Sequence, residues 1–136
     1  MLIELRGTVV KGFGRGSKTL GIPTANLDEA SLKKSNIDGS LTGIYAGFAT
    51  VGNDATVYNA VLSIGWNPQF QNTHKTAETW ILHTFENDFY GEQLNVKIVA
   101  YLRPEAVFDT IDELVQAIHK DAKTAIIGLL NYKHVI

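Results

Sequence analysis

The spacing of the apolar residues constrains this chain most strongly, because its period changes once, close to residue 108. In residues 93–102 the period is two, and Val99 is the exception to it. The alternate apolar positions that share one face are Leu94, Val96, Ile98, Ala100 and Leu102. This alternation predicts a β-strand with one buried face.

Four earlier segments also have the composition of strands: residues 2–10, 44–51, 56–64 and 77–85. The second and third of them flank Gly-Asn-Asp-Ala at residues 52–55, a turn sequence that predicts a hairpin. Several short strands separated by turns predict an antiparallel barrel or sandwich.

After residue 108 the apolar residues follow a helical period instead. Thr110 and Glu113 fit a capping box, in which the Thr110 hydroxyl meets the Glu113 amide, and Phe108 is placed to pack against the start of the helix. We expect this helix to cover one open side of the barrel with its apolar residues, which are Ile111, Leu114, Val115, Ile118, Ala122, Ala125, Ile126 and Leu129.

Length and composition exclude several classes of protein. A chain of 136 residues, 45% apolar and 19% charged, fits one globular domain over residues 1–136. Twelve Lys and Arg against fourteen Asp and Glu leave a charge of −2, which argues against nucleic-acid binding. The absence of cysteine excludes a thiol nucleophile, a disulfide framework and a cysteine zinc site. No targeting segment and no apolar run of about 20 residues is visible, so we expect a cytoplasmic protein that does not bind membranes. We also expect a monomer.

Residues 11–21 form a glycine-rich basic segment. Closely spaced glycines let backbone amides approach an anionic oxygen, and Arg15 and Lys18 add positive charge that would neutralise phosphate. The Walker A pattern fails because Ser17 stands where it requires glycine, and the dinucleotide pattern fails at the same position. Taken alone, the segment is either a phosphate-binding loop or a flexible basic surface loop. Its glycines are Gly12, Gly14, Gly16 and Gly21.

Thr24 and Asn26 follow Pro23, two residues apart. On an extended segment they point the same way, and both carry neutral oxygen atoms that suit Mg²⁺ bridged by nucleotide phosphates. The same residues after a proline are also common in turns, so the pattern alone leaves both readings open.

Seven blocks of this sequence together resemble the signature of riboflavin kinases. They occur in the family's order and spacing and cover nearly all of the chain to Asp121. The blocks are GFGRGSK at 12–18, LGIPTAN at 20–26, GIY at 43–45, SIGWNP at 63–68, KTAE at 75–78, DFYG at 88–91 and YLRPE at 101–105.

The resemblance implies a mainly β fold, a six-stranded antiparallel Greek-key β-barrel with a C-terminal α-helix packed on it. Five strands are read from the sequence. The sixth is therefore expected to be short or to lie inside one of the two long loops, residues 11–43 and 65–76.

The resemblance also implies the roles of individual residues. Glu78 matches the catalytic glutamate, although an isolated Glu at a strand end would otherwise be read as a solvated surface charge. Thr24 and Asn26 match the ligands of Mg²⁺, or of another divalent ion such as Zn²⁺, and Arg103 and Phe108 match the flavin-contacting positions. The implied ATP-binding residues are Gly12, Gly14, Arg15, Lys18, Thr24, Asn26, Ile81, His83 and Tyr90.

One conflict follows from alternation along residues 77–85. Ile81 and His83 fall on one face of the strand and Glu78 on the other, so a bulge, or approach of adenine and the reacting atoms from different directions, is needed to reconcile their roles.

The activity implied by the resemblance is transfer of the γ-phosphate of MgATP to the 5′-hydroxyl of the riboflavin ribityl chain. The substrates would be riboflavin and ATP. No adenylyltransferase module is expected in this chain, so the expected product is FMN and not FAD. Two alternatives are a flavin-binding or flavin-reductase-like barrel without kinase activity and an oligonucleotide-binding barrel, which the acidic balance opposes.

Overall fold

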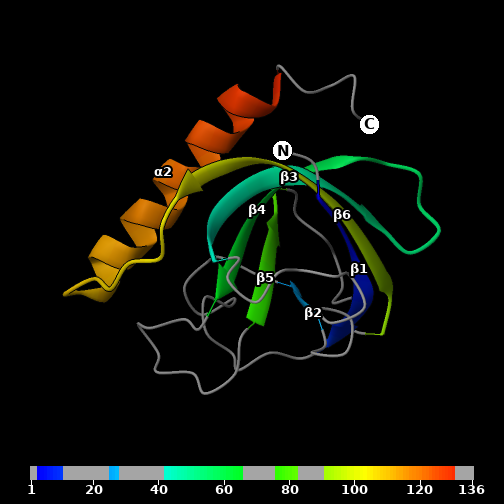
Figure 1. Ribbon diagram of the computed structural model, residues 1–136, viewed down its shortest axis with the longest axis horizontal. Coiled ribbons are helices and arrows are strands. Elements are labelled where there is room, and N and C mark those ends of the chain that lie inside the picture. The colour runs from blue at the N-terminus through cyan, green and yellow to red at the C-terminus, as the bar shows by residue number, and fades with distance from the viewer. Residues whose placement is uncertain (1–2, 11–24, 28–41, 66–75, 83–90, 131–136) are drawn as a thin grey trace.

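The computed structural model describes residues 3–10, 25–27, 42–65, 76–82 and 91–130. Over these ranges the chain forms six strands followed by one long helix (Figure 1). The elements are β1 (Ile3–Val10), β2 (Ala25–Leu27), β3 (Gly43–Val51), β4 (Tyr58–Gly65), β5 (Thr76–Ile81), β6 (Gln93–Arg103) and α2 (Ile111–Leu129).

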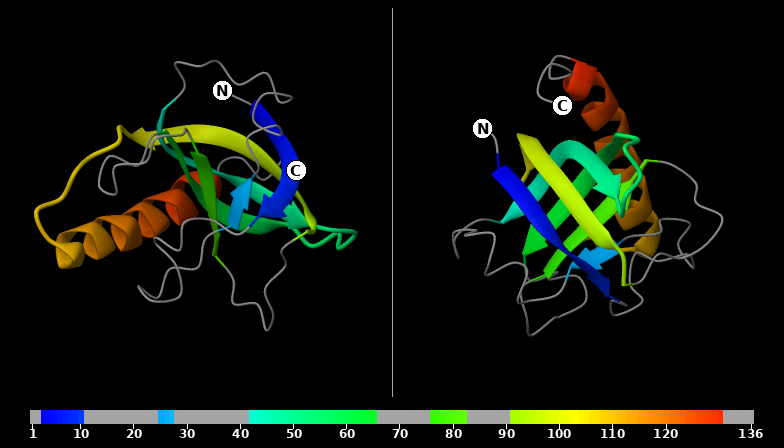
Figure 2. Two further views of the ribbon diagram at one scale, coloured as in Figure 1. Left: turned by 90° about the horizontal axis from the view of Figure 1, so that it is seen from below. Right: turned by 90° about the vertical axis from the view of Figure 1, so that its right-hand side faces the viewer.

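The strands form a closed barrel in the order β1-β2-β5-β4-β3-β6. Each pair of neighbours is antiparallel, including the pair β1–β6 that closes the barrel. The views in Figure 2 show the strands curling around a common interior, with α2 outside the wall. No helix among the described residues is both long enough and apolar enough to cross a membrane.

The strand that the sequence reading lacked is β2, which has three residues and lies inside the long loop of residues 11–43. Its edges pair with β1 and β5, so a short segment completes the barrel. The predicted strand over residues 77–85 was too long, because β5 begins at Thr76 and ends at Ile81, with Leu82 in a bend. Residues 83–85 lie outside the described part of the chain.

The predicted hairpin between β3 and β4 is confirmed. Gly52 has a φ of 58°, a left-handed conformation that glycine adopts without steric cost. The Asp54 amide donates to the Val51 carbonyl at 3.2 Å, and the Thr56 amide donates to Asp54 Oδ1 at 2.9 Å. Because Thr56 is held in this turn, β4 begins at Tyr58 and not at the predicted residue 56.

Apolar side chains form two cores, one on each side of the barrel wall. The first fills the barrel interior and includes Leu5, Leu62 and Ile98, each fully buried. The second lies between the outer wall and α2, where Phe48, Val61 and Val99 meet the helix. The helix residues in this second core are Ala122, Ala125 and Leu129.

The prediction that the apolar residues of β6 share one face is wrong beyond Ile98. The pairing with β3 slips twice, so that Val99 and Leu102 are each an extra residue on β6. A bulge turns the following side chains to the other face. Ala100 and Leu102 therefore pack in the core under α2 with Val99, the residue that broke the alternation, while Leu94, Val96 and Ile98 remain in the barrel interior.

The helix starts as predicted. Thr110 is its N-cap, and Thr110 Oγ1 accepts a hydrogen bond from the Glu113 amide at 3.1 Å. The expectation that the helix covers an open side is wrong, because the barrel is closed and α2 packs on the outer wall formed by β3, β4 and β6. Two of its predicted apolar contacts, Ile111 and Ile126, are each 45% exposed.

Candidate active site

One row of paired residues crosses the outer wall of the barrel. Asn26 on β2 is opposite Glu78 on β5, and Glu78 is opposite Ser63 on β4. The row continues from Ser63 to Ile44 on β3 and from Ile44 to Arg103 on β6. It therefore joins three residues that sequence resemblance assigned to different parts of one site: Asn26, Glu78 and Arg103.

The spacing of the strands sets the separations along this row. Neighbouring strands are about 4.8 Å apart, so Glu78 and Asn26 are one strand spacing apart, and Glu78 and Arg103 are about 14 Å apart along the wall.

Glu78 is half-buried on the outer face of β5. Its neighbours in sequence, Ala77 and Thr79, are fully buried on the inner side, while Trp80 lies on the Glu78 side and packs on α2. The Trp80 and His119 rings meet edge to face with their centroids 5.6 Å apart. The helix therefore packs against Trp80 on the same outer face of β5 that carries Glu78.

Ile81 does not join this row. It is 4% exposed in the barrel interior, on the face opposite Glu78. The pairing of β5 with β4 runs from Gly65–Thr76 to Ala60–Ile81 without a shift, so no bulge brings Ile81 to the Glu78 face.

Several predicted site residues lie outside the described part of the chain: Gly12, Gly14, Arg15, Lys18, Thr24, His83 and Tyr90. For Asn26 the structure describes the backbone, which fixes its register opposite Glu78. The role of each of these residues stays a prediction.

The structure brings the two predicted flavin-contacting residues together. The Arg103 guanidinium carbon lies over the Phe108 ring, 5.7 Å from its centroid. Arg103 Nη1 also donates to the Pro104 carbonyl at 3.1 Å. The guanidinium therefore organises the chain between the end of β6 and the start of α2.

Asp121 is a component that sequence reasoning missed. It is 7% exposed on the inner face of α2 and accepts hydrogen bonds from Arg103 Nε and Nη2, the shortest being 2.8 Å to Oδ2. A signal was present, because Asp121 falls within the apolar stripe between Ile118 and Ala125. An acidic residue in such a stripe predicts a buried cationic partner.

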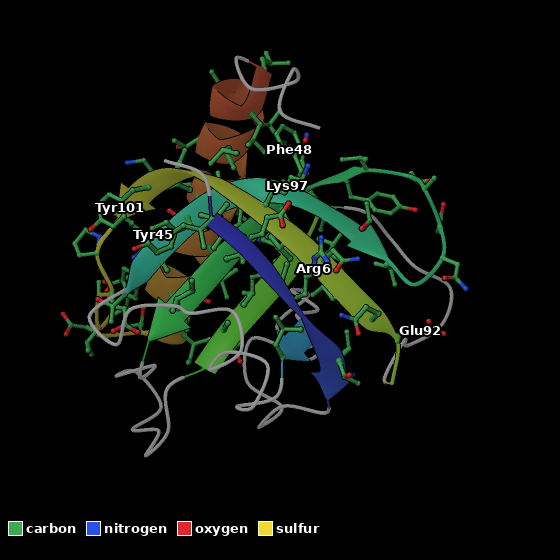
Figure 3. The ribbon with its side chains drawn as sticks, turned by 45° about the vertical axis from the view of Figure 1, so that its right-hand side comes forward. Arg6, Tyr45, Phe48, Glu92, Lys97 and Tyr101 are labelled. Atoms are coloured by element: carbon green, nitrogen blue, oxygen red, sulfur yellow. The ribbon has the colours of Figure 1, made fainter. Side chains whose placement is uncertain are left out.

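Two tyrosine rings lie at the end of the barrel where β6 finishes. The Tyr45 and Tyr101 rings meet edge to face, with centroids 5.3 Å apart, at the end of β6 opposite Glu92 (Figure 3). Tyr45 Oη donates to the Thr42 carbonyl at 2.8 Å, and burial, followed by the neighbouring Tyr101, raises the pKa of the Tyr45 phenol. The phenol therefore stays protonated as a donor at neutral pH.

Glu105 is held against the end of β4. A Cβ placed on Gly65 would overlap the Glu105 carboxylate, so a larger residue there would displace that carboxylate from the backbone. Gly65 also has a φ of 152°, which disfavours other residues. This contact brings the segment after β6 close to the strand that pairs with β5.

A cavity of about 230 Å³ lies elsewhere on the wall, over β1, β3 and β6. Arg6, Phe48 and Lys97 mark it in Figure 3, and Arg6 pairs with Glu4 at 3.5 Å. No residue of the row from Asn26 to Arg103 lines this cavity, so it is separate from the candidate site. Its lining residues are Glu4, Arg6, Phe48, Thr50, Val57, Asn95, Val96 and Lys97.

Comparisons with known proteins agree on one family. The family model described as riboflavin kinase (flavokinase) matches residues 2–127. The riboflavin kinase of Homo sapiens is 57% identical over 120 residues, which are 88% of this chain and 76% of that protein.

Two solved structures share the fold. The riboflavin kinase of Trypanosoma brucei superposes with a TM-score of 0.69 at 26% identity, covering 95% of this chain and 78% of that one. A Streptococcus pneumoniae structure titled a macrolide-efflux protein gives a TM-score of 0.68 at 31% identity, and the match covers 90% of this chain but 38% of that one. Since the family model spans most of the sequence and the human relative is 57% identical, this chain belongs to the riboflavin kinase family.

Proposed function

We propose that this chain is an ATP:riboflavin 5′-phosphotransferase, which transfers the γ-phosphate of ATP to the 5′-hydroxyl of the ribityl chain and yields FMN and ADP. Membership of the riboflavin kinase family supports this assignment. The structural observation that carries it is the row from Asn26 through Glu78 to Arg103 on the outer wall of the barrel.

In this proposal Glu78 accepts the proton of the ribityl 5′-hydroxyl. The alkoxide oxygen then forms a bond to the γ-phosphorus as the bond to the ADP oxygen breaks on the opposite side. A carboxylate can accept a proton from an alcohol, and the loose transition state of phosphoryl transfer requires mainly in-line placement. Glu78 therefore orients the hydroxyl as well as accepting its proton.

The nucleotide is proposed to lie on the β2 side of Glu78. Gly12, Gly14, Arg15 and Lys18 would meet the phosphates, and His83 and Tyr90 would complete the nucleotide site. Residues directly opposite in an antiparallel pair have Cβ atoms about 5 Å apart, so the register of Asn26 supports phosphate close to the Glu78 carboxylate. Ile81 would contribute to the nucleotide site through its backbone, because its side chain is buried in the barrel interior.

A divalent metal, Mg²⁺ by our proposal, fits the oxygen donors on this side of the row. Thr24 and Asn26 would hold it, and when bound it would neutralise charge on the transferring phosphate. The support is the chemistry of the donors and the position of Asn26 beside an acidic residue.

The riboflavin ring is proposed to lie at the other end of the row, against Phe108 and close to Arg103. A flat, largely apolar ring needs an aromatic surface with a few directed polar groups. The stacked Arg103 and Phe108 pair supplies both.

Further features of the protein remain part of this proposal. We infer the Greek-key connection of the six strands, supported by the non-sequential order that puts β2 beside β5 and β3 beside β6. We also propose a single domain over residues 1–136 without nucleic-acid partners, supported by the length of the chain and its charge of −2. A cytoplasmic monomer without membrane partners stays a prediction.

The direct test is an assay of ADP release by purified protein with MgATP, with and without riboflavin, and identification of the flavin product by mass. We expect ADP release only with riboflavin, in equal amount to the FMN formed. ADP release that ignores riboflavin, or none at all, contradicts the proposal.

A binding titration separates the kinase from a flavin-binding barrel. Quenching of riboflavin fluorescence is measured with and without MgADP, and a kinase with adjoining sites should bind flavin differently in the two conditions. Tight FMN binding that MgADP does not change, combined with no turnover, favours the non-catalytic alternative.

A further inference from the structure

Helix α2 carries one buried acid on the face that packs against the barrel. Asp121 is 7% exposed, and its neighbours on that face are the apolar residues Leu114, Ala122 and Ala125. A buried carboxylate is costly unless it is paired and hydrogen-bonded. The structure supplies that partner in Arg103, which is 18 positions away at the end of β6.

The contact between them is a planar fork. Arg103 Nε lies 2.9 Å from Asp121 Oδ1 and 3.2 Å from Oδ2, and Arg103 Nη2 lies 2.8 Å from Oδ2. The side chains are 26% exposed for Arg103 and 9% for Asp121. Pairing at two points fixes the plane of the guanidinium, whereas contact with a single point charge would leave that plane free to rotate.

Fixing this plane has a consequence for the segment that follows β6. The remaining nitrogen, Nη1, donates to the Pro104 carbonyl, and the guanidinium face covers the Phe108 ring. Rotation of the guanidinium would therefore disturb both Pro104 and Phe108. The orientation of Phe108 is linked through Arg103 to a carboxylate on the helix.

The bulge at Leu102 makes this arrangement possible. Arg103 pairs with Ile44 on the outer face, whereas Tyr101 pairs with Tyr45, a residue of the barrel interior. Without the extra residue, alternation would place Arg103 on the same face as Tyr101, away from α2. The bulge turns Arg103 towards the helix that carries Asp121.

An ion pair is not required simply to dock a helix on a wall. Apolar side chains of similar volume often serve equally well in place of a buried pair. The contribution that is specific to Asp121 is the direction it gives to Arg103.

We propose that Asp121 is a positioning residue for the flavin site: it holds Arg103 in the plane that presents Phe108 to the isoalloxazine ring. This inference rests on the proposed function, in which Arg103 and Phe108 receive riboflavin. Asp121 acts through Arg103 and does not itself contact substrate.

The test compares Asp121→Asn with Asp112→Asn, an exposed acid in the first turn of the same helix. Steady-state kinetics give kcat and the KM for riboflavin and for ATP, and urea unfolding checks that each variant is folded. We expect Asp121→Asn to raise the KM for riboflavin about tenfold, the size of a lost charge-assisted hydrogen bond, and to leave the KM for ATP unchanged. Asp112→Asn should change neither KM.

A double-mutant cycle with Arg103→Lys distinguishes positioning from general support of the fold. Lysine keeps the charge but not the fork, so if Asp121 acts through Arg103, the double variant should bind riboflavin about as weakly as the weaker single variant. Riboflavin affinity measured by fluorescence provides this reading without turnover.

An unchanged riboflavin KM in folded Asp121→Asn, or effects of the two substitutions that simply add, overturns the proposal. If Asp121→Asn does not fold, Arg103→Lys alone carries the test, and an unchanged riboflavin KM in that variant overturns it equally. Failure of the proposed function is recognised separately, because the unsubstituted protein would then show no riboflavin-dependent release of ADP.

Discussion

Asn26 and Glu78 stand directly opposite one another on the paired strands β2 and β5. They are 52 positions apart in sequence, and β2 is only three residues long. The pairing brings the end of the segment that begins with the glycine-rich loop to the strand that carries the acidic residue. In the proposed function, the residues that bind phosphate and the residue that accepts the proton would therefore lie side by side on one wall.

Removing the charge of Glu78 should abolish most turnover while leaving nucleotide binding intact. We expect Glu78→Gln to lower kcat by about 10²–10⁴, the usual contribution of a general base, because the amide cannot accept the hydroxyl proton. The affinity for MgADP, measured by calorimetry, should stay the same. Glu4→Gln, on an exposed residue of β1, serves as the control and should retain full turnover. Equal turnover in both variants would remove Glu78 from the mechanism.

The hairpin turn should give the protein a small pH-dependent stability. Hydrogen bonds from Thr56, first from its amide and then from its hydroxyl, hold the pKa of Asp54 below its ordinary value of 3.8. A lowered pKa in the folded state contributes stability that is present above 3.8 and is lost as the pH falls through the folded value. Asp54→Ala should therefore be less stable than the parent at pH 7, and the difference should shrink below pH 3.8.

Asp54→Asn separates the hydrogen bond from the charge. Its amide oxygen still accepts from the Thr56 amide, so most of the stability at pH 7 should remain, without the pH dependence. Urea unfolding at several pH values measures both effects. A stability difference between parent and Asp54→Ala that is constant down to acid pH would contradict this explanation.

The hydroxyl of Thr79 should cost the protein stability. Thr79 is fully buried inside the barrel, and its Oγ1 has no hydrogen-bond partner within the part of the chain that the structure describes. Thr79→Val keeps the shape and removes the unsatisfied group, so we expect the free energy of unfolding to rise by about 1 kcal/mol. Thr79→Ser keeps the hydroxyl and deletes a methyl group, and should lower it by about 1 kcal/mol. A loss of stability in Thr79→Val would show that the hydroxyl is bonded in solution.

Gly65 and Gly128 should respond in opposite ways to substitution by alanine. At Gly65 a Cβ would meet the Glu105 carboxyl group, and the φ of 152° adds backbone strain, so Gly65→Ala should cost about 1–3 kcal/mol. At Gly128, in the last turn of α2, a Cβ meets nothing within 4 Å, and alanine should stabilise the helix by about 0.5–1 kcal/mol. Thermal unfolding of both variants measures the two effects, and a Gly65→Ala variant as stable as the parent would contradict the expected backbone strain at this position.

The sequence alone was enough to predict the local elements. Composition, and alternation in residues 93–102, located four of the five predicted strands to within two residues. The Gly-Asn-Asp-Ala turn predicted the hairpin, and Thr110 with Glu113 predicted the start of α2. These features depend on neighbours within a few positions, so the chain carries the information directly. The family, and with it Glu78 as the candidate base, also followed from motifs in the sequence.

Only the tertiary structure decided which distant residues meet. β2 is too short to show alternation, and it is a strand because the edges of β1 and β5 are available on either side. The bulges at Val99 and Leu102 reverse the face of β6, which the sequence records only as an exception to a pattern. The hydrogen-bond partner of the buried Asp121 is Arg103, 18 residues earlier on another element. Pairings of this kind depend on closing long loops of chain around a shared core, and no local preference specifies them.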